Sequence, residues 1–229
     1  MDAITSDHDL YERFVRNYAW QFAGSDAMRR EAYDLRSLEA RMRNPYSNID
    51  PYDACAQHIL LRHRPSGQSL AATRLLVKSE LPKGMQLPVE HVAGAKIFLP
   101  GNAAEENSPV SLSEMGEIYL NQTLIRDLDE TESIISLGMC LAAYALARLL
   151  FHDYLLLVLP LDRFKHFRAS GLKYEYASAM LDPERDEAVF YLDLNTEIRE
   201  STAIYRFSQQ ISDQLAPFVN LPVLQEQEA

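Results

Sequence analysis

The chain has 229 residues, of which 47% are hydrophobic, and it carries a formal net charge of −11. A chain of this length and apolar content can bury one substantial core and leaves little for a second domain. Non-specific nucleic-acid binding requires a basic face that neutralises phosphates, and this strongly acidic chain argues against it. We therefore expect a single domain over residues 1–229 and no nucleic-acid partner.

The cysteines, the N-terminus and the most apolar stretch all favour a cytoplasmic protein. Cys55 and Cys140 lie far apart, and neither stands at metal-ligand spacing from a histidine, so we expect no disulfide framework and no metal or redox cofactor. The first ten residues are acidic and lack the basic and apolar regions of a secretory signal. Residues 137–161 contain charged side chains, whereas a bilayer span needs about 20 apolar residues. We expect no integral membrane association.

Two helices are expected at the start of the chain. Apolar residues recur at four-residue intervals and predict an amphipathic helix over 8–23, with Gly24 as its C-terminal stop. A second helix begins near Ser25 or Asp26 and ends before Pro45. The residues that follow it, 44–53, are rich in turn-forming and acidic side chains.

A hairpin and a long surface segment are expected next. Residues 57–63 and 69–77 are apolar runs on either side of the turn-forming residues 64–68, which predicts two antiparallel strands. Residues 78–113 have four prolines and little periodicity, so they predict an excursion over the surface with room for one short helix. Such a segment is long enough to cover a site.

The middle of the chain predicts a strand over about 116–125 and then a long helix over 131–152, with Thr131 as its N-cap. Residues 154–159 form a continuous apolar run of strand length. A short helix follows from Asp162 to Gly171.

The last part of the chain predicts a second hairpin and a final helix. Residues 172–178 and 188–194 flank a turn-forming segment and pair most naturally with each other. The final helix is capped near Thr196, and its apolar positions are Ile204, Phe207, Ile211 and Leu215.

This order of elements predicts the α/β (α+β) class, with a mixed, mostly antiparallel central sheet flanked by helices. Within the single domain we assign residues 1–53 to the N-terminal helices and acidic loop, 54–195 to the sheet core, and 196–229 to the C-terminal helix and tail.

Several segments resemble the acyl-homoserine-lactone synthases and their relatives, the N-acyl amino acid synthases and the exosortase-associated acyltransferases. That family belongs to the GCN5-related N-acetyltransferase superfamily. Its pattern runs from an arginine and an aromatic residue on the second helix, through an acidic D-x-x-D loop, to an arginine on the second hairpin strand. The matching residues here are Arg30, Tyr33, Asp50, Asp53 and Arg74.

The chain also departs from the pattern of the homoserine-lactone members. Asn48 stands where they have a glutamate two residues before D-x-x-D. Their E-x-S-R motif on the central strand matches residues 117–120, which keep the glutamate and lack the serine and arginine. The resemblance therefore implies the fold and an acyl transfer more than it implies use of S-adenosylmethionine. A glycine-rich pyrophosphate loop is missing, which favours a carrier-protein donor over coenzyme A.

Amide formation from a thioester needs a base for the attacking amine and donors for the oxyanion. Glu117 on the expected central strand is the candidate base, although a strand glutamate can equally face solvent. Tyr119 replaces the family's serine, and its hydroxyl is a candidate donor or proton carrier.

The acceptor site is expected among the residues that carry the resemblance. Asp50 and Asp53 either bind the ammonium of the acceptor or hold Arg30 and Arg74 in a charge network that orders the N-terminal helices. Arg74 lies in an apolar strand and needs a buried partner. The resemblance implies that Tyr33 lines the acceptor pocket, whereas an aromatic residue on a helix is also typical of plain core.

A basic cluster stands out in this acidic chain. Acyl carrier proteins are acidic, so a basic patch would steer their docking, and in the resembling family the carrier docks around the corresponding helix. A solvated helix face would show the same run of charges. The cluster consists of Arg163, Lys165, Arg168 and Lys173.

The sequence thus predicts an N-acyltransferase that moves a fatty acyl group from acyl carrier protein, or acyl-CoA, to the amine of an amino acid or related small metabolite. Within this class an autoinducer synthase is an alternative. A second alternative is a non-catalytic module of the same fold that binds an acyl ligand or a protein partner.

Overall fold

A computed structural model describes residues 7–43, 50–91, 97–100, 110–161, 173–182, 186–196 and 203–219. Its strands form one eight-stranded sheet with the order β1-β2-β3-β4-β6-β8-β7, and β5 pairs with β3 outside this path. All neighbouring strands are antiparallel except β4 and β6, which are parallel. The strands are β1 Tyr18–Phe22, β2 Gln57–His63, β3 Ser69–Val77, β4 Leu112–Met115, β5 Tyr119–Leu120, β6 Tyr154–Pro160, β7 Tyr174–Asp182 and β8 Glu187–Asp193. The expected fold class is confirmed.

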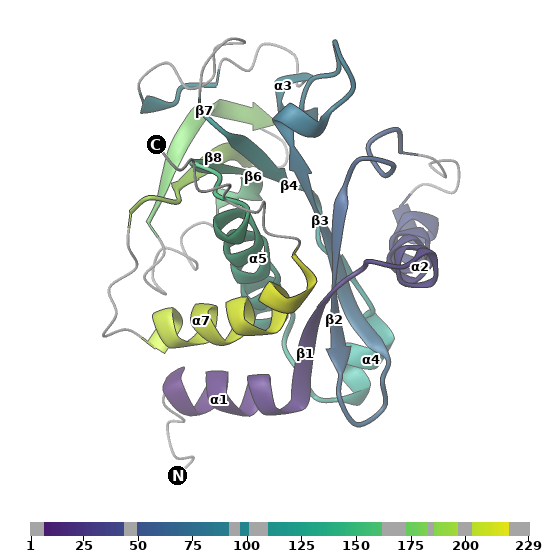
Figure 1. Ribbon diagram of the computed structural model, residues 1–229. Coiled ribbons are helices and arrows are strands. Elements are labelled where there is room, and N and C mark those ends of the chain that lie inside the picture. Colours follow the sequence, from purple (N-terminus) through teal and green to yellow (C-terminus); the bar gives the residue numbers. More distant parts are fainter. Residues whose placement is uncertain are drawn as a thin grey trace, which may run out of the picture.

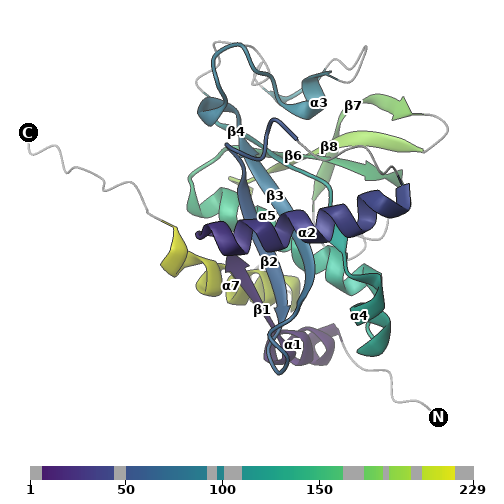
Figure 2. The same ribbon diagram turned by 90° about the vertical axis from the view of Figure 1, so that its right-hand side faces the viewer.

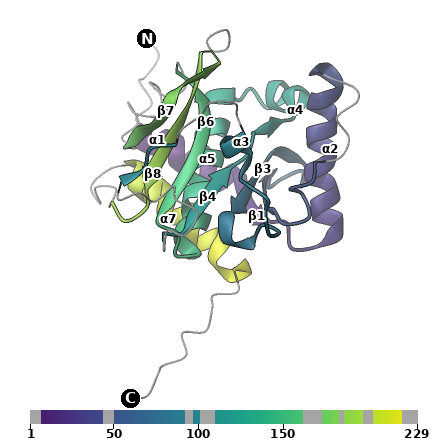
Figure 3. The same ribbon diagram turned by 90° about the horizontal axis from the view of Figure 1, so that it is seen from above.

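Helices cover both faces of this sheet. Figure 1 shows α1, α5 and α7 on one side of β1–β3 and α2 on the other, and the view from above in Figure 3 shows the same separation. In Figure 2, α2 runs across the face of β2 and β3. The α-helices are α1 Asp7–Asn17, α2 Asp26–Arg43, α3 Pro88–His91, α4 Gln122–Asp127, α5 Glu132–Leu149 and α7 Ala203–Leu215, and the 3₁₀ helices are η1 Lys78–Glu80 and η3 Ala216–Phe218.

The main core lies between the sheet and the α1–α5–α7 layer. Phe14 of α1, Trp20 of β1 and Phe207 of α7 are buried and pack edge to face or tilted, with ring centroids 5.5–6.1 Å apart. The Trp20 indole N–H donates to the Gly138 carbonyl oxygen of α5 at 3.1 Å. A side chain at Gly138 would lie 3.1 Å from the indole, so the glycine lets α5 approach Trp20 closely.

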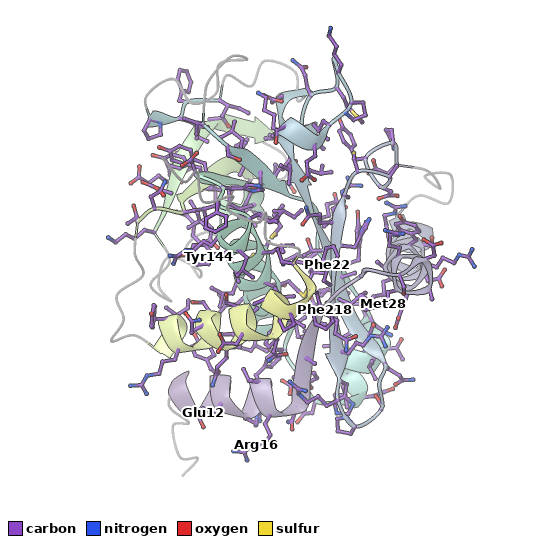
Figure 4. The ribbon with its side chains drawn as sticks, viewed as in Figure 1. Glu12, Arg16, Phe22, Met28, Tyr144 and Phe218 are labelled. Carbon is purple, nitrogen blue, oxygen red and sulfur yellow. The ribbon has the colours of Figure 1, made fainter. Side chains whose placement is uncertain are left out.

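The first helix is shorter than its periodicity predicted. It ends at Asn17, and residues 18–22 form β1, which pairs with β2. Tyr18 and Trp20 alternate with less buried residues, as a strand with one core face requires. Figure 4 shows the polar side of α1 through Glu12 and Arg16, which are exposed. The expected helix over 18–23 is therefore wrong, because sheet pairing outweighs the four-residue spacing of Tyr18 and Phe22.

The second helix and the first hairpin are confirmed. α2 begins at Asp26 and ends before Pro45, and β2 and β3 have the predicted bounds. The turn between these strands contains Gly67 with a φ of 69°, a backbone conformation that favours glycine. The described part of the long segment that follows contains the expected short helix, α3, and also the 3₁₀ helix η1.

The strand expected over 116–125 is wrong. The chain there contains β4, which ends at Met115, then the two-residue β5, and then α4. Asn121 ends the strand region because its side chain accepts a hydrogen bond from the Leu124 amide and caps α4. β4 is short and gains its stability from pairing with β3 and β6. Such pairing between distant segments cannot be predicted from the local sequence pattern.

The second half follows the expected order. β6 matches the predicted strand, β7 and β8 pair as a hairpin, and α7 buries all four predicted apolar positions. Thr131 precedes α5, but its hydroxyl contacts the Ser133 hydroxyl and makes no capping bond to the backbone. The helix expected over 162–171 lies outside the described residues.

Among the described residues, α5 is the helix long and apolar enough to cross a membrane, and 78% of its most apolar window is buried inside the protein. It serves here as the central core helix. The same residues contain no group of three or more His, Cys, Asp or Glu side chains that could hold a metal ion.

We predict that Trp20→Ala lowers the free energy of unfolding by about 3–5 kcal/mol, because it removes a buried aromatic ring and leaves a cavity. Urea unfolding followed by circular dichroism measures this. Tryptophan fluorescence cannot be used, because Trp20 is the single tryptophan of the chain and the variant lacks it. Phe218→Ala, at a residue that is 53% exposed, should change the value by no more than about 0.5 kcal/mol. Equal effects of the two variants would contradict this description of the core.

Candidate functional site

Arg74 lies in the middle of β3 and is almost fully buried. Its side chain is 8% exposed, and its guanidinium contacts two carboxylates of the turn that precedes β2. Nη2 lies 2.6 Å from Asp50, and Nη1 lies 2.9 Å from Asp53. A buried guanidinium requires such partners, because an unpaired charge in the protein interior is costly.

Asp53 joins this pair to α2. Arg36 contacts both carboxylate oxygens of Asp53 at 2.6 and 2.7 Å, and Arg74 shares one of these oxygens. The four side chains Arg36, Asp50, Asp53 and Arg74, which we name the charge cluster, therefore connect a helix, a turn and a strand. Because such bonds are charge-assisted and bidentate, they fix the relative position of the three elements.

The charge cluster corrects one expectation. In one of the two expected roles of the aspartates they pair with Arg30, but Arg30 is exposed on α2, and Arg36 makes the contacts instead. Ala32 is buried on α2, and Arg36 lies one helical turn further along the same face. The helical spacing from Ala32 therefore predicts that Arg36 faces the sheet.

The turn that carries the aspartates is itself ordered. The Tyr52 amide donates to the Asp50 carboxylate at 2.9 Å, and the Tyr52 hydroxyl donates to the Gln86 carbonyl oxygen at 2.9 Å. The Arg74 guanidinium lies 5.7 Å from the centre of the Tyr52 ring. Burial alone raises the pKa of Asp50, but the bonds from Arg74 and the Tyr52 amide outweigh it, and the pKa lies below its ordinary value.

Gly116 makes room for Arg74. A side chain at this position would place its Cβ 2.8 Å from Arg74 Cγ and 3.0 Å from its Nε. The Gly116 amide donates to the Arg74 carbonyl oxygen at 2.9 Å, and the Thr73 hydroxyl donates to the carbonyl oxygens of Gly116 and Glu117 at 3.2 Å. The backbone after β4 is thus held against β3 beside the charge cluster.

Glu114 of β4 is a buried carboxyl group that sequence reasoning missed. It is 4% exposed and accepts a hydrogen bond from the Val89 amide at 3.1 Å. Burial raises its pKa to about 8, against the opposing influence of the Val89 amide and Arg74. A carboxyl group with a pKa near neutral can exchange a proton at physiological pH, which is the property of a general acid or base.

Glu117 and Tyr119 lie close to this carboxyl group in sequence but differ in environment. Glu117 was expected on the central strand; it is exposed and lies in the 116–118 link between β4 and β5. That placement was wrong, and Glu114 is the glutamate on the strand. Tyr119 is half-buried beside α2, and burial raises its pKa to about 12, so its hydroxyl stays protonated at neutral pH.

Tyr33 and His58 meet between α2 and β2. Their rings pack edge to face with centroids 5.2 Å apart, and the Arg36 guanidinium lies 5.3 Å from the centre of the Tyr33 ring. Burial raises the pKa of Tyr33 and lowers the pKa of His58. The structure therefore places Tyr33 next to the charge cluster, and its role in lining the acceptor pocket stays a prediction.

The sheet divides beside these residues. β4 pairs with β6 from Leu112 to Met115, and the chain then turns so that β5 pairs with β3. β6 continues to Pro160 without a partner on its β4 side among the described residues. The separation of β4 and β6 begins after Met115, one residue beyond Glu114 and two residues before Glu117.

The expected carrier-docking cluster is only partly described. Lys173 is exposed just before β7, and Arg163, Lys165 and Arg168 lie outside the described residues. Their role remains a prediction.

We predict that Gly116→Ala lowers the free energy of unfolding by about 1–3 kcal/mol, because the added methyl group collides with a side chain that two aspartates hold in place. Gly24→Ala is the matched control: its Cβ would meet Phe22 at 3.6 Å, an ordinary contact, and the change should stay below about 1 kcal/mol. Chemical denaturation measures both. A neutral Gly116→Ala would show that Arg74 does not need this space.

Glu114 also predicts a pH dependence of stability. A carboxyl whose pKa is raised from 4.5 to about 8 on folding contributes most below pH 4.5, and this contribution is lost as the pH rises to about 8. Glu114→Gln stays neutral at all pH values. We expect wild type and variant to be equally stable at about pH 4, below the unfolded pKa, and the variant to be more stable by about 2–5 kcal/mol at about pH 9. Urea titrations at both values measure this, and equal stability at pH 9 would contradict the raised pKa.

Comparisons by sequence give no match: no family model and no curated protein matches the chain. Solved structures do match. The AHL synthase LasI is 16% identical, with a TM-score of 0.59 over 82% of this chain and 95% of LasI. FeeM, an N-acyl amino acid synthase from uncultured soil microbes, is 16% identical, with a TM-score of 0.56 over 83% of this chain and 96% of FeeM.

A third similar structure is BjaI, a CoA-dependent acyl-homoserine lactone synthase, at 12% identity and a TM-score of 0.56 over 85% of this chain and 89% of BjaI. The similarity spans nearly the whole length of each of these proteins. At such low identity it establishes the arrangement of the chain. The protein therefore has the fold that these acyl-homoserine-lactone and N-acyl amino acid synthases share.

Proposed function

We propose that the protein is an N-acyltransferase that moves a fatty acyl group from acyl carrier protein, or acyl-CoA, to the amine of an amino acid or related small metabolite. The observation that carries the proposal is Glu114, a buried carboxyl group of raised pKa one residue before the point where β4 and β6 separate. Its support is the fold, because the similar structures include an AHL synthase and an N-acyl amino acid synthase.

The reaction that we propose is aminolysis of a thioester. The nitrogen of the acceptor amine attacks the thioester carbonyl carbon while the base takes a proton from it. The tetrahedral intermediate then collapses to an amide as the C–S bond breaks, and the protonated base returns the proton to the leaving thiolate, which departs as a thiol. Glu114 is the preferred base, because a carboxylate of pKa about 8 holds a proton far better than an ordinary carboxylate does. Glu117 is the second candidate for the base, and the Tyr119 hydroxyl is the candidate donor to the oxyanion.

The charge cluster would shape the acceptor side. Its two aspartates are engaged by Arg36 and Arg74, which favours the role of a scaffold over direct binding of the acceptor's ammonium. Tyr33 of α2 and Tyr119, which packs beside this helix, lie near this scaffold and would line the acceptor site. Arg30, exposed on α2, is no longer needed for the network.

The proposal leaves two alternatives for the acyl donor and more than one for the acceptor. The similar protein BjaI is a CoA-dependent enzyme, whereas the basic cluster expected around Arg163 to Lys173 favours an acyl carrier protein. The similarity to LasI and BjaI keeps an acyl-homoserine-lactone synthase as an alternative within the class. The donor is identified by which thioester, acyl carrier protein or acyl-CoA, yields a product, and the acceptor is identified by the product itself.

We predict that the purified protein forms new N-acyl products when it is incubated with acyl carrier proteins or acyl-CoAs of several chain lengths and a pool of amines. The pool contains the amino acids and S-adenosylmethionine, and mass spectrometry identifies the products. Glu114→Gln should lower the rate by a factor of about 10²–10⁴, the usual contribution of a positioned base.

Two further variants complete this experiment. Glu117→Gln decides between the two carboxylates, because the larger loss of rate marks the base. Glu132→Gln, at an exposed position in the first turn of α5, is the control and should keep the wild-type rate. If carrier protein binds and no amine yields a product, a non-catalytic module of this fold replaces the enzyme as the conclusion.

A further inference from the structure

Helix α3 meets the Glu114 carboxyl group through a backbone hydrogen bond. The Val89 amide donates to Glu114 Oε2 at 3.1 Å, and both residues are buried. Within the sheet, Glu114 lies directly opposite Leu76 of β3 and Leu156 of β6, which are also buried. Residues opposite each other in a sheet leave the same face, so the carboxyl group has apolar neighbours on both strands. The hydrogen bond comes from α3.

Glu90 holds the start of α3, which is a single helical turn. Its Oε2 accepts a hydrogen bond from the Leu87 amide at 2.8 Å, and its own amide donates to the Leu87 carbonyl oxygen at 2.9 Å. A side chain that reaches back to the amide before the helix in this way is one half of a capping box. Pro88 takes the first helical position, where no N–H is needed. The next amide, that of Val89, is the one that reaches Glu114.

Lys78 anchors Glu90 to the sheet. Its Nζ lies 2.6 Å from Glu90 Oε1, and the two side chains are 26% and 14% exposed. Lys78 directly follows β3, whose last residue, Val77, pairs with β4. Each oxygen of the Glu90 carboxylate therefore has its own donor, one from α3 and one from the end of β3. Charge-assisted bonds of this kind fix the position of α3 over β4.

The charged groups around Glu114 come from three elements. Burial is the main cause of its raised pKa, Arg74 of β3 opposes it, and the negative charges of Glu90 on α3 and Asp50 in the turn add to it. The Tyr52 ring of the same turn also lies near the carboxyl group. Asp50 is bound to Arg74, so any change there disturbs the charge cluster. Glu90 is the nearby negative charge that lies outside this cluster.

We propose that Glu90, held by Lys78, is a positioning residue for the base Glu114. Its carboxylate fixes α3 so that the Val89 amide stays on Oε2 of Glu114, and its negative charge acts on the same carboxyl group. This inference rests on the proposed acyl transfer, in which Glu114 takes a proton from the acceptor amine and returns it to the leaving thiolate. Because Val89 occupies Oε2, the proton is carried by Oε1.

Three substitutions separate the charge of Glu90 from its support of α3. Glu90→Gln removes the negative charge and keeps an oxygen that can accept from the Leu87 amide. Lys78→Met removes the neighbouring cation and leaves Glu90 ionised. Glu80→Gln is the matched control, because it removes a negative charge from an exposed position on η1, where the carboxylate contacts Gln57.

The first measurement is the pKa of Glu114, followed by NMR in protein labelled with ¹³C-glutamate and assigned by the loss of its signal in Glu114→Gln. We expect Glu90→Gln to lower this pKa by about 0.5–1 and Lys78→Met to raise it by a similar amount, with no change in Glu80→Gln. If the pair only stiffened α3, both variants would weaken the Val89 bond and raise the pKa. A shift in the same direction, no shift in either, or an equal shift in the control would overturn the inference.

The second measurement follows the Val89 amide in protein labelled with ¹⁵N-valine, where Val89→Ile assigns the signal by removing it. In the wild type this signal should shift with pH at the same midpoint as Glu114, because a carboxylate accepts the hydrogen bond more strongly than a carboxylic acid does. Glu90→Gln should keep the size of the shift, and Glu90→Ala, which lacks the capping oxygen, should reduce it at least about twofold. An equal shift in Glu90→Ala would overturn the support of α3. Circular dichroism verifies that the variants fold.

The pH dependence of kcat/KM connects these values to the reaction and keeps the two proposals separate. The acid limb of the profile should move down in Glu90→Gln and up in Lys78→Met, in step with the pKa measured by NMR. A limb that stays in place while the NMR value moves would identify another base and overturn the inference. If the wild-type protein forms no product, the acyl transfer fails, and the two NMR measurements still decide whether Glu90 positions Glu114.

Discussion

The position of the site depends on the burial of one cation, the Arg74 guanidinium, in the middle of a sheet. Removing a guanidinium from water is costly, so the fold must bring carboxylates to it. Asp50 and Asp53 meet this need, and they draw the turn before β2 down onto the sheet. Asp53 in turn binds Arg36 and thereby fixes α2 over the same face. Without Arg74 the turn and the helix would lose their common anchor.

Two carboxyl groups on this face of the sheet, Asp50 and Glu114, differ in protonation state. Asp50 lies against a guanidinium and an amide and stays ionised, whereas Glu114 lies in an apolar layer and holds its proton to about pH 8. Two carboxyl groups on one side of a sheet thus differ in proton affinity because of what surrounds them. Of the two groups, Glu114 is the one whose pKa allows proton exchange near neutral pH.

The sequence predicted what local patterns encode. The hairpin of β2 and β3 follows from its turn residues, and α2 follows from its apolar face and Pro45. The pairing of Arg74 with the aspartates was one of two interpretations of an arginine in an apolar strand. β1 and β4 were missed because both are short and depend on partners distant in sequence. Because β4 was not predicted, Glu114 was overlooked and Glu117 was placed on a strand. Arg36 was overlooked because Arg30 was assumed to lie on the face of α2 that packs against the sheet.

The order of the strands gives the molecule two sequence-continuous halves. Residues 18–77 form β1, α2, the aspartate turn, β2 and β3 without any insertion from elsewhere, and they supply every member of the charge cluster together with Tyr33 and His58. The strands from β6 onward lie beyond β4 and contribute none of these residues. Recombination at the segment after Val77 would therefore exchange the whole charge cluster as a cassette while leaving β6–β8 untouched.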